Sequence, residues 1–296
     1  MTRIARYGWR LAGEPGLGRV VSAHGDYYRL VADEVPTGEI LARKKKSVFT
    51  RMKTAASADM KAAKIPGGRA PAPAAAPTPI TGDFVRFSYN RQGDSLITAV
   101  LPRRSHFERQ DPTARRQVQT LAVNFDTLFI MMALTENFSL PRLRRYLELA
   151  ADIGEAQAVV VLTKRDLVPP AVLAERLAAA GELAAPHRVA AVSAVTAAGL
   201  EEIRGCFAPQ ATVAFIGSSG VGKSTLLNVL AGAEVARAGE VQEWSGKGRH
   251  TTTSRELVML PNGAMVIDTP GIREIGRLGE VERLQVKGES CHRYRK

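Results

Sequence analysis

Cysteine is scarce in this sequence, and long apolar runs are absent. Two of the 296 residues are cysteines, too few for a disulfide framework and fewer than the four ligands of a structural zinc site. No stretch approaches the roughly 18 consecutive apolar residues of a membrane-spanning helix. Basic residues near the start are not followed by an apolar segment, so no secretory signal is predicted. We therefore expect a cytoplasmic protein that makes no membrane contact.

Acidic residues are fewer than basic ones. The chain has 41 lysines and arginines against 29 aspartates and glutamates, which gives a net charge of +12 and an isoelectric point near 10.0. This excess favours a polyanionic partner, because lysine and arginine displace counterions from phosphates. A basic protein that is merely soluble is the alternative. The apolar fraction of 45% is typical of a globular protein, and the length suits about two domains.

The first part of the chain, 1–105, consists of short strand-like segments separated by turn signals. Alternating apolar and polar residues, with β-branched or aromatic side chains, predict strands. The segments are 18–23, 27–31, 38–42, 83–88 and 95–100. Four or five short strands over this length predict a small all-β barrel, and an OB-type barrel is one possibility.

An alanine- and proline-rich segment at about 50–79 interrupts these strands. Proline continues neither a helix nor a strand ladder, so we expect a disordered insertion in the barrel. Basic runs at 43–46 and 51–53 lie at its start. Either a solvated surface or contact with RNA would explain them, and their place on the predicted barrel favours RNA.

Residues 106–276 alternate apolar strands with helical segments. The runs 127–132 and 156–162 are almost continuously apolar, as in strands that are covered on both faces. Helical spacing follows at 140–151 and 171–180. This pattern predicts an α/β domain with a mostly parallel sheet and helices on both faces.

A phosphate-binding motif follows a further apolar strand, 212–216. The segment matches G-x-x-x-x-G-K-[ST] and leads into a helix, the context that this motif requires. Its glycines let backbone N–H groups face phosphate oxygens, Lys223 would reach the β- and γ-phosphates, and Ser224 would ligate Mg²⁺. The residues predicted to bind nucleotide here are Gly217, Ser218, Ser219, Gly220, Val221, Gly222, Lys223, Ser224 and Thr225.

A second motif, D-x-x-G, ends the apolar strand 265–267 and is typical of GTPases in this position. Asp268 would hold Mg²⁺ through water, and the Gly271 N–H would contact the γ-phosphate. The polar loop between the two motifs contains consecutive threonines. Thr252, or alternatively Thr251, would complete the Mg²⁺ shell, unless these threonines simply begin a strand.

Guanine recognition requires a carboxylate for the base N1–H and exocyclic amine, and a lysine stem over the ring. Two segments that follow apolar strands offer these groups, and their residues are Thr163, Lys164, Arg165, Asp166, Ser193 and Ala194. The first four fit the N/T-K-x-D pattern, and the last two would contact the guanine carbonyl through the backbone. All of them precede the phosphate-binding motif, an inverted order for a GTPase. The hypothesis requires both sets of loops to meet at one edge of the sheet.

With this inverted order, the sequence resembles the circularly permuted, small-ribosomal-subunit-dependent GTPases of the RsgA family. The resemblance covers the barrel as well and extends to about Arg273. It is carried by 124–126, 145–147 and 248–253 in the predicted GTPase domain, and by 18–21, 82–85 and 101–105 in and after the barrel.

The resemblance implies a late maturation factor for the small ribosomal subunit. Such a protein binds 16S rRNA through its barrel and hydrolyses GTP slowly until the subunit stimulates it. Its ligands would be GTP or GDP and Mg²⁺, and we expect a monomer. Ile272 occupies the position of the water-orienting glutamine of Ras-type GTPases. The resemblance assigns that role to His250, with Lys223 as the second catalytic residue.

Members of this family usually end in a zinc-binding helical domain with cysteine and histidine ligands. Here the segment 277–296 offers only Cys291 and His292, and Cys206 lies in the predicted GTPase domain. We therefore expect a short remnant of that domain and no zinc site in this chain.

Three other interpretations fit parts of the sequence. An RNA-binding checkpoint would use the nucleotide only to set its affinity for RNA. An ATPase or kinase would share the phosphate-binding motif but would not need the segment from Thr163 to Asp166. A permuted GTPase of large-subunit assembly would lack the N-terminal barrel.

Overall fold

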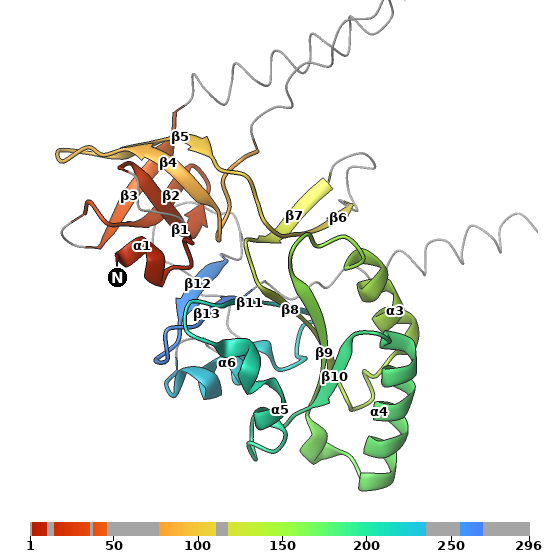
Figure 1. Cartoon of the computed structure of the whole chain (residues 1–296). Coiled ribbons are helices and arrows are strands. Elements are labelled where there is room, and N and C mark those ends of the chain that lie inside the picture. Colours follow the sequence, from red (N-terminus) through yellow and green to blue (C-terminus); the bar gives the residue numbers. More distant parts are fainter. Residues whose placement is uncertain are drawn as a thin grey trace, which may run out of the picture.

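The computed structural model describes residues 2–10, 15–35, 38–45, 77–110, 118–234 and 255–268. Its first strands form a five-stranded barrel (Figure 1). The short helix α1 (Arg3–Arg6) precedes the barrel. The barrel strands are β1 (Leu17–His24), β2 (Tyr27–Ala32), β3 (Glu39–Lys44), β4 (Phe84–Ser88) and β5 (Ser95–Val100). The strand order is β1-β2-β3-β5-β4, and β4 pairs back onto β1 to close the barrel. This closed arrangement matches the OB-type barrel predicted from the sequence.

All five strands contribute apolar side chains to the barrel interior. One fully buried residue from each strand packs in a single cluster: Val20, Leu30, Ala42, Val85 and Ile97. Because successive side chains of a strand point to opposite faces, the neighbours of these residues point away from the barrel interior. Those of β3 are exposed, whereas those of β1 are buried on that side too. The alternation that predicted these strands is therefore the pattern that builds the barrel core.

The second part of the chain forms a mostly parallel sheet. Its strands are β8 (Thr127–Ala133), β9 (Gln157–Thr163), β10 (Arg188–Ala191), β11 (Thr212–Gly217), β12 (Glu256–Met259) and β13 (Met265–Asp268). They lie in the order β10-β9-β8-β11-β13-β12, and each neighbouring pair is parallel except β12 with β13. The carboxyl ends of the five parallel strands therefore meet at one edge, where open sheets of this kind bind ligands.

Helices cover both faces of this sheet, as predicted (Figure 1). They are α3 (Leu140–Leu149) and α4 (Pro170–Ala184) on one face, and α5 (Leu200–Arg204) and α6 (Lys223–Ala231) on the other. The central strand β8 divides its side chains between two apolar cores. Leu128 and Ile130 pack with α3 and α4, whereas Phe129 and Met131 pack with α5 and α6. Burial on both faces explains why this strand has an unbroken apolar run.

The strands β6 (His106–Gln110), β7 (Val118–Val123) and β12 and the short helices α1 and α5 were not predicted from the sequence. The two-stranded ribbon of β6 and β7 follows the barrel, and the predicted boundary at residue 105 falls between β5 and β6. The strand β12 pairs with β13 on one side and with the barrel strand β1 on the other, where Ser22 is in register with Glu256. The barrel and the second sheet therefore form one continuous 11-stranded sheet.

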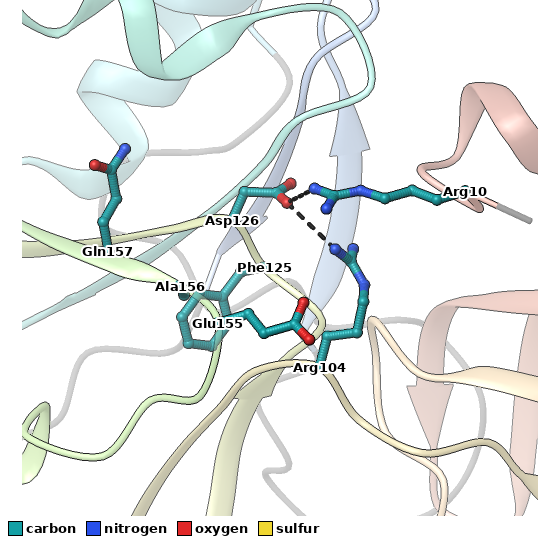
Figure 2. Close-up of a pocket in the computed structure, with 7 residues that line it drawn as sticks. All are labelled: Arg10, Arg104, Phe125, Asp126, Glu155, Ala156 and Gln157. Carbon is teal, nitrogen blue, oxygen red and sulfur yellow. Dashed lines mark hydrogen bonds and ion pairs between the residues drawn. The ribbon is translucent and has the colours of Figure 1, made fainter.

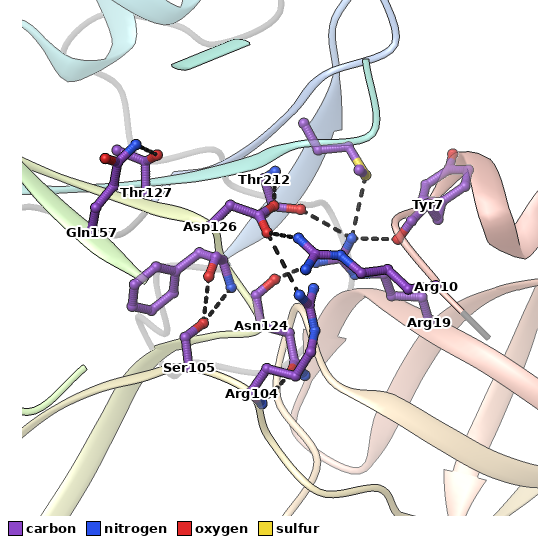
Figure 3. Close-up of polar contacts among 12 residues, drawn as sticks. Tyr7, Arg10, Arg19, Arg104, Ser105, Asn124, Asp126, Thr127, Gln157 and Thr212 are labelled. Atoms are coloured by element: carbon purple, nitrogen blue, oxygen red, sulfur yellow. Dashed lines mark hydrogen bonds and ion pairs between the residues drawn. The ribbon is translucent and has the colours of Figure 1, made fainter. Parts of the chain in front are cut away.

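A buried arginine joins the barrel to the second sheet (Figure 3). Arg19 of β1 is fully buried, and its guanidinium donates to the Tyr7 carbonyl, to the Asn124 carbonyl at 2.9 Å and to the Thr212 hydroxyl at 3.1 Å. Burial lowers the pKa of Arg19 to about 9, and the negative charge of Asp126 makes the largest opposing contribution. The side chain therefore remains charged at neutral pH, with its donors paired across the junction.

Asp126 forms the other half of this junction (Figure 3). Its carboxylate accepts from the Thr212 amide at 2.8 Å and pairs with Arg10 at 2.5 Å and Arg104 at 3.6 Å. Arg10 precedes the barrel and Arg104 follows it. The segment 124–126, which contributed to the family resemblance, is thus the place where the barrel meets the amino ends of β8 and β11.

Several predicted features lie outside the described residues. They are most of the insertion at 50–79, the tail 277–296 with Cys291 and His292, and the segment around His250 and the threonines. Cys206 is described and is buried in the short turn η2 (Gly205–Phe207). None of the helices in the described part of the chain is long and apolar enough to cross a membrane.

Candidate functional site at the carboxyl edge of the sheet

The phosphate-binding segment connects β11 to α6. The helix α6 begins at Lys223, and Gly222 is its N-cap with φ +101°, a conformation that favours glycine. Gly217 lies so close to β8 that a side-chain Cβ would approach the Met131 carbonyl oxygen to 2.6 Å. These two glycines therefore shape the loop, and the helix N-terminus behind it presents free N–H groups of the kind that bind phosphate.

Lys223 is the buried cation of this loop. Its side chain is only 8% exposed, and its Nζ donates to the Gly217 carbonyl at 3.0 Å and the Ser218 carbonyl at 3.1 Å. Burial lowers the pKa of Lys223, whereas the negative charge of Asp268 raises it. The ammonium is therefore held inside the loop, next to the predicted position of the nucleotide phosphates.

Asp268 ends β13, the strand beside β11. Burial raises the pKa of the Asp268 carboxyl to about 6, and Lys223 opposes this rise. Its Oδ1 atom is buried and finds no hydrogen-bond partner among the described residues. A buried carboxylate oxygen without a partner is costly unless a cation pairs with it, and oxygen ligands suit Mg²⁺. Asp268, together with the Ser224 hydroxyl in the first turn of α6, fits a Mg²⁺ site.

The predicted base-recognition loop follows β9 and contacts the phosphate-binding loop directly. The hydroxyl of Thr163 is buried and donates to the Val221 carbonyl at 2.6 Å. Lys164 has φ +62° at the start of the short turn η1 (Arg165–Leu167), a conformation that is uncommon outside glycine and often occurs at functional sites. Asp166 is exposed in the same turn. The structure therefore brings together two loops that are more than fifty residues apart in the sequence.

The segment with Ser193 and Ala194 lies beside this loop, because it follows β10 and β10 is parallel to β9. The Arg165 amide donates to the Val192 carbonyl at 3.2 Å, which ties the two segments together. The Ser193 hydroxyl accepts from the amides of Val195 and Thr196 at 3.2 and 3.0 Å, so it fixes the turn through its side chain. Ala194 is left partly exposed at this edge.

Three predicted site residues lie outside the described residues: His250, Thr252 and Gly271. Thr251, the alternative to Thr252, lies there too. The site described here therefore consists of the phosphate-binding loop, the base-recognition segments and Asp268. All of these lie at or just after the carboxyl ends of β9, β10, β11 or β13.

A pocket of about 330 Å³ lies elsewhere, at the junction with the barrel (Figure 2). It is lined by Arg10, Arg104, Phe125, Asp126, Glu155, Ala156 and Gln157. These residues include those just before β8 and β9, so the pocket belongs to the amino edge of the sheet. Its arginines are already paired with Asp126. The nucleotide loops occupy the opposite edge, and this pocket is not part of the candidate site.

Sequence reasoning missed the contact between Thr163 and Val221. The N/T-K-x-D pattern accepts either asparagine or threonine at its first position. It cannot show which distant carbonyl group the Thr163 hydroxyl contacts. In the structure the Thr163 hydroxyl donates directly to the Val221 carbonyl of the phosphate-binding loop. This bond fixes the spacing between the two loops.

The fold and these loops define a P-loop GTPase domain whose chain order is circularly permuted, because the segments predicted to recognise the base, after β9 and β10, precede the phosphate-binding loop after β11. A crystal structure of YjeQ from Thermotoga maritima is 23% identical, with a TM-score of 0.57 over 88% of this chain and 76% of that one. The structure of YloQ, described as a circularly permuted GTPase, is 21% identical, with a TM-score of 0.54 over 89% of this chain and 74% of that one.

Sequence comparison defines the family. The family model described as RsgA GTPase matches residues 100–278, and the chain belongs to this family. A small ribosomal subunit biogenesis GTPase RsgA 2 from Lactiplantibacillus plantarum is 37% identical over 260 residues, which cover 88% of this chain and 66% of that protein. The chain thus spans slightly less than two thirds of the length of this relative.

Proposed function

We propose that this protein hydrolyses GTP to GDP and phosphate, is stimulated by the small ribosomal subunit, and acts in late maturation of the 30S subunit by binding 16S rRNA. It would work as a monomer in the cytoplasm, where small subunits are assembled. The observation that supports the proposal is the hydrogen bond from the Thr163 hydroxyl to the Val221 carbonyl, because it holds the proposed base-recognition segment against the phosphate-binding loop. The names of the relatives support the choice of the small subunit.

The proposed roles of the site residues rest on the sequence motifs and, for the residues that the structure describes, on their places in the fold. Asp166 and Lys164 bind the guanine base, with backbone help from the segment at Ser193. The N–H groups from Gly217 to Thr225 and the Lys223 ammonium bind the phosphates and neutralise charge that develops on the transferred group. Ser224, Thr252 and Asp268 hold Mg²⁺, which supplies further charge neutralisation when bound.

The outer face of the barrel supports RNA binding. Tyr27 of β2, Arg43 of β3 and Leu96 of β5 are lateral neighbours across three strands. The Arg43 guanidinium lies 4.2 Å from the centre of the Tyr27 ring, and Tyr27 is 41% exposed. Exposed aromatic and arginine side chains provide stacking surfaces for unpaired bases, and positive charge attracts the phosphate backbone.

The proposed function is tested by phosphate release from GTP with purified small subunits, with large subunits, and with neither. We expect slow turnover alone, a strong increase with small subunits and no increase with large ones. Co-sedimentation with a non-hydrolysable GTP analogue should show the same choice of subunit. Equal stimulation by both subunits, or hydrolysis of ATP as fast as GTP, would contradict the proposal.

His250 is proposed as the residue that orients the attacking water, since Ile272 cannot donate or accept a hydrogen bond through its side chain. We expect His250→Ala to lower subunit-stimulated turnover by on the order of 10²-fold, a typical contribution of proton-transfer or orienting groups, while GTP affinity stays nearly unchanged. Turnover and affinity are measured on the same preparation. If stimulated turnover stays at the level of the unsubstituted protein, His250 does not have this role.

A further inference from the structure

One short strand, β12, lies between the barrel and β13, which carries Asp268, the carboxylate proposed to hold Mg²⁺. In the row of paired residues across β1, β12 and β13, Ser22 is in register with Glu256, and Glu256 is in register with Asp268. A shift of β12 along the sheet would therefore change the backbone pairing of Asp268 directly. Whatever fixes β12 in place also fixes this end of β13.

The barrel holds the start of β12 through Thr81. The Thr81 side chain is buried, and its hydroxyl donates to the carbonyl of Arg255, the residue just before β12, at 2.9 Å. The Arg255 guanidinium in turn donates to the Thr120 carbonyl of β7 at 3.1 Å. Arg255 is thus held from the barrel through its backbone and from the ribbon through its side chain.

The loop that carries Thr81 is itself firmly anchored in the barrel. The neighbouring Gly82 donates its amide to the Val20 carbonyl of β1 at 2.9 Å. The carboxylate of Asp83 is buried and accepts two bonds from Arg103 at 2.8 Å each. Thr81 therefore transmits the position of the barrel, because its own backbone has little freedom to follow β12.

We propose that Thr81 of the barrel is a positioning residue for the GTPase site: through Arg255 and Glu256 it holds the strand pairing that orients Asp268 toward Mg²⁺. This inference rests on the proposed function and adds a route by which the barrel acts on the nucleotide site. A displacement of the barrel by a bound partner would reach Asp268 through the hydrogen bond from Thr81 to Arg255 and the backbone pairing of Glu256 with Asp268.

The test replaces Thr81 with Val, which keeps the branched shape and removes the hydroxyl donor. Thr98→Val is the matched control, because the Thr98 hydroxyl also donates to a backbone carbonyl, that of Arg86 at 3.2 Å, but within the barrel. Thr81→Ser retains the donor. The readout is the Mg²⁺ concentration that gives half-maximal binding of a fluorescent, non-hydrolysable GTP analogue, with thermal unfolding recorded for each variant.

We expect Thr81→Val to need about three- to tenfold more Mg²⁺, the factor that corresponds to one ordinary hydrogen bond, and Thr81→Ser to restore most of this loss. Affinity for the nucleotide without Mg²⁺ should be the same in all variants. Equal Mg²⁺ dependence of Thr81→Val and Thr98→Val overturns the inference and leaves the proposed function standing. An unsubstituted protein that binds no GTP analogue overturns both.

Discussion

Replacing Lys223 with Ala should abolish measurable GTP hydrolysis and weaken GTP binding. The Lys223 ammonium is buried in the phosphate-binding loop and donates to the Gly217 and Ser218 carbonyls. Its removal takes away the positive charge next to the β- and γ-phosphates, both before and during phosphoryl transfer. Loss of one such group costs on the order of 10²–10³-fold in rate. Phosphate release under saturating GTP measures the rate, and titration with a labelled analogue measures the affinity.

The control for this substitution is Lys45→Ala, which removes an exposed lysine at the end of β3. Turnover without ribosomal subunits should be unchanged in this variant, because Lys45 is far from the nucleotide loops in the fold. Turnover of Lys223→Ala at more than a tenth of the unsubstituted rate would show that the loop does not bind the transferred phosphate as described.

Replacing Asp166 with Asn should remove much of the preference for GTP over ATP. A carboxylate accepts hydrogen bonds from both the N1–H and the amine of guanine, whereas an amide offers one acceptor and brings an unwanted donor. Hydrogen bonds to a charged group contribute about 1.5–3 kcal/mol, so GTP affinity should fall on the order of 10- to 100-fold. ATP affinity should change little. Competition of both nucleotides against one labelled analogue gives both values in one assay.

Glu175→Gln serves as the control for this change, because Glu175 is an exposed carboxylate on α4, the helix that follows the base-recognition loop. It should leave both affinities as they are. If Asp166→Asn behaves like Glu175→Gln, the base is recognised elsewhere, and the proposal that residues 163–166 bind guanine is wrong.

The sequence predicted the sheet best where burial dictates composition. The run in β8 is apolar at almost every position because its two faces pack on two different cores, with Ile130 on one side and Phe129 on the other. The phosphate-binding segment was equally clear, since its glycines and lysine recur at fixed spacing for one chemical reason. In both cases the residues that determine the structure lie within one short segment, so the sequence of that segment is enough to predict it.

Long-range pairing could not be read in this way. Arg19 sits in a strand where a charged side chain ordinarily faces water, yet it is fully buried because its partners lie at Asn124 and Thr212, far along the chain. The strand β12 has four residues, and the short apolar run that starts at Leu257 does not show which strands it pairs with, β1 on one side and β13 on the other. Thr81 carried no signal at all, since its contact depends on how the barrel packs.

The single sheet shared by the two parts has a consequence for dividing the protein. Cutting the chain after residue 105 would remove β1 and leave one side of β12 without a hydrogen-bonding neighbour. Unpaired strand edges recruit other strands and promote aggregation. The same cut would separate the Arg19 guanidinium from the Asn124 carbonyl and the Thr212 hydroxyl that it contacts at the junction. Poor solubility of a barrel-less fragment would thus reflect an exposed edge and would say little about whether its nucleotide site is sound.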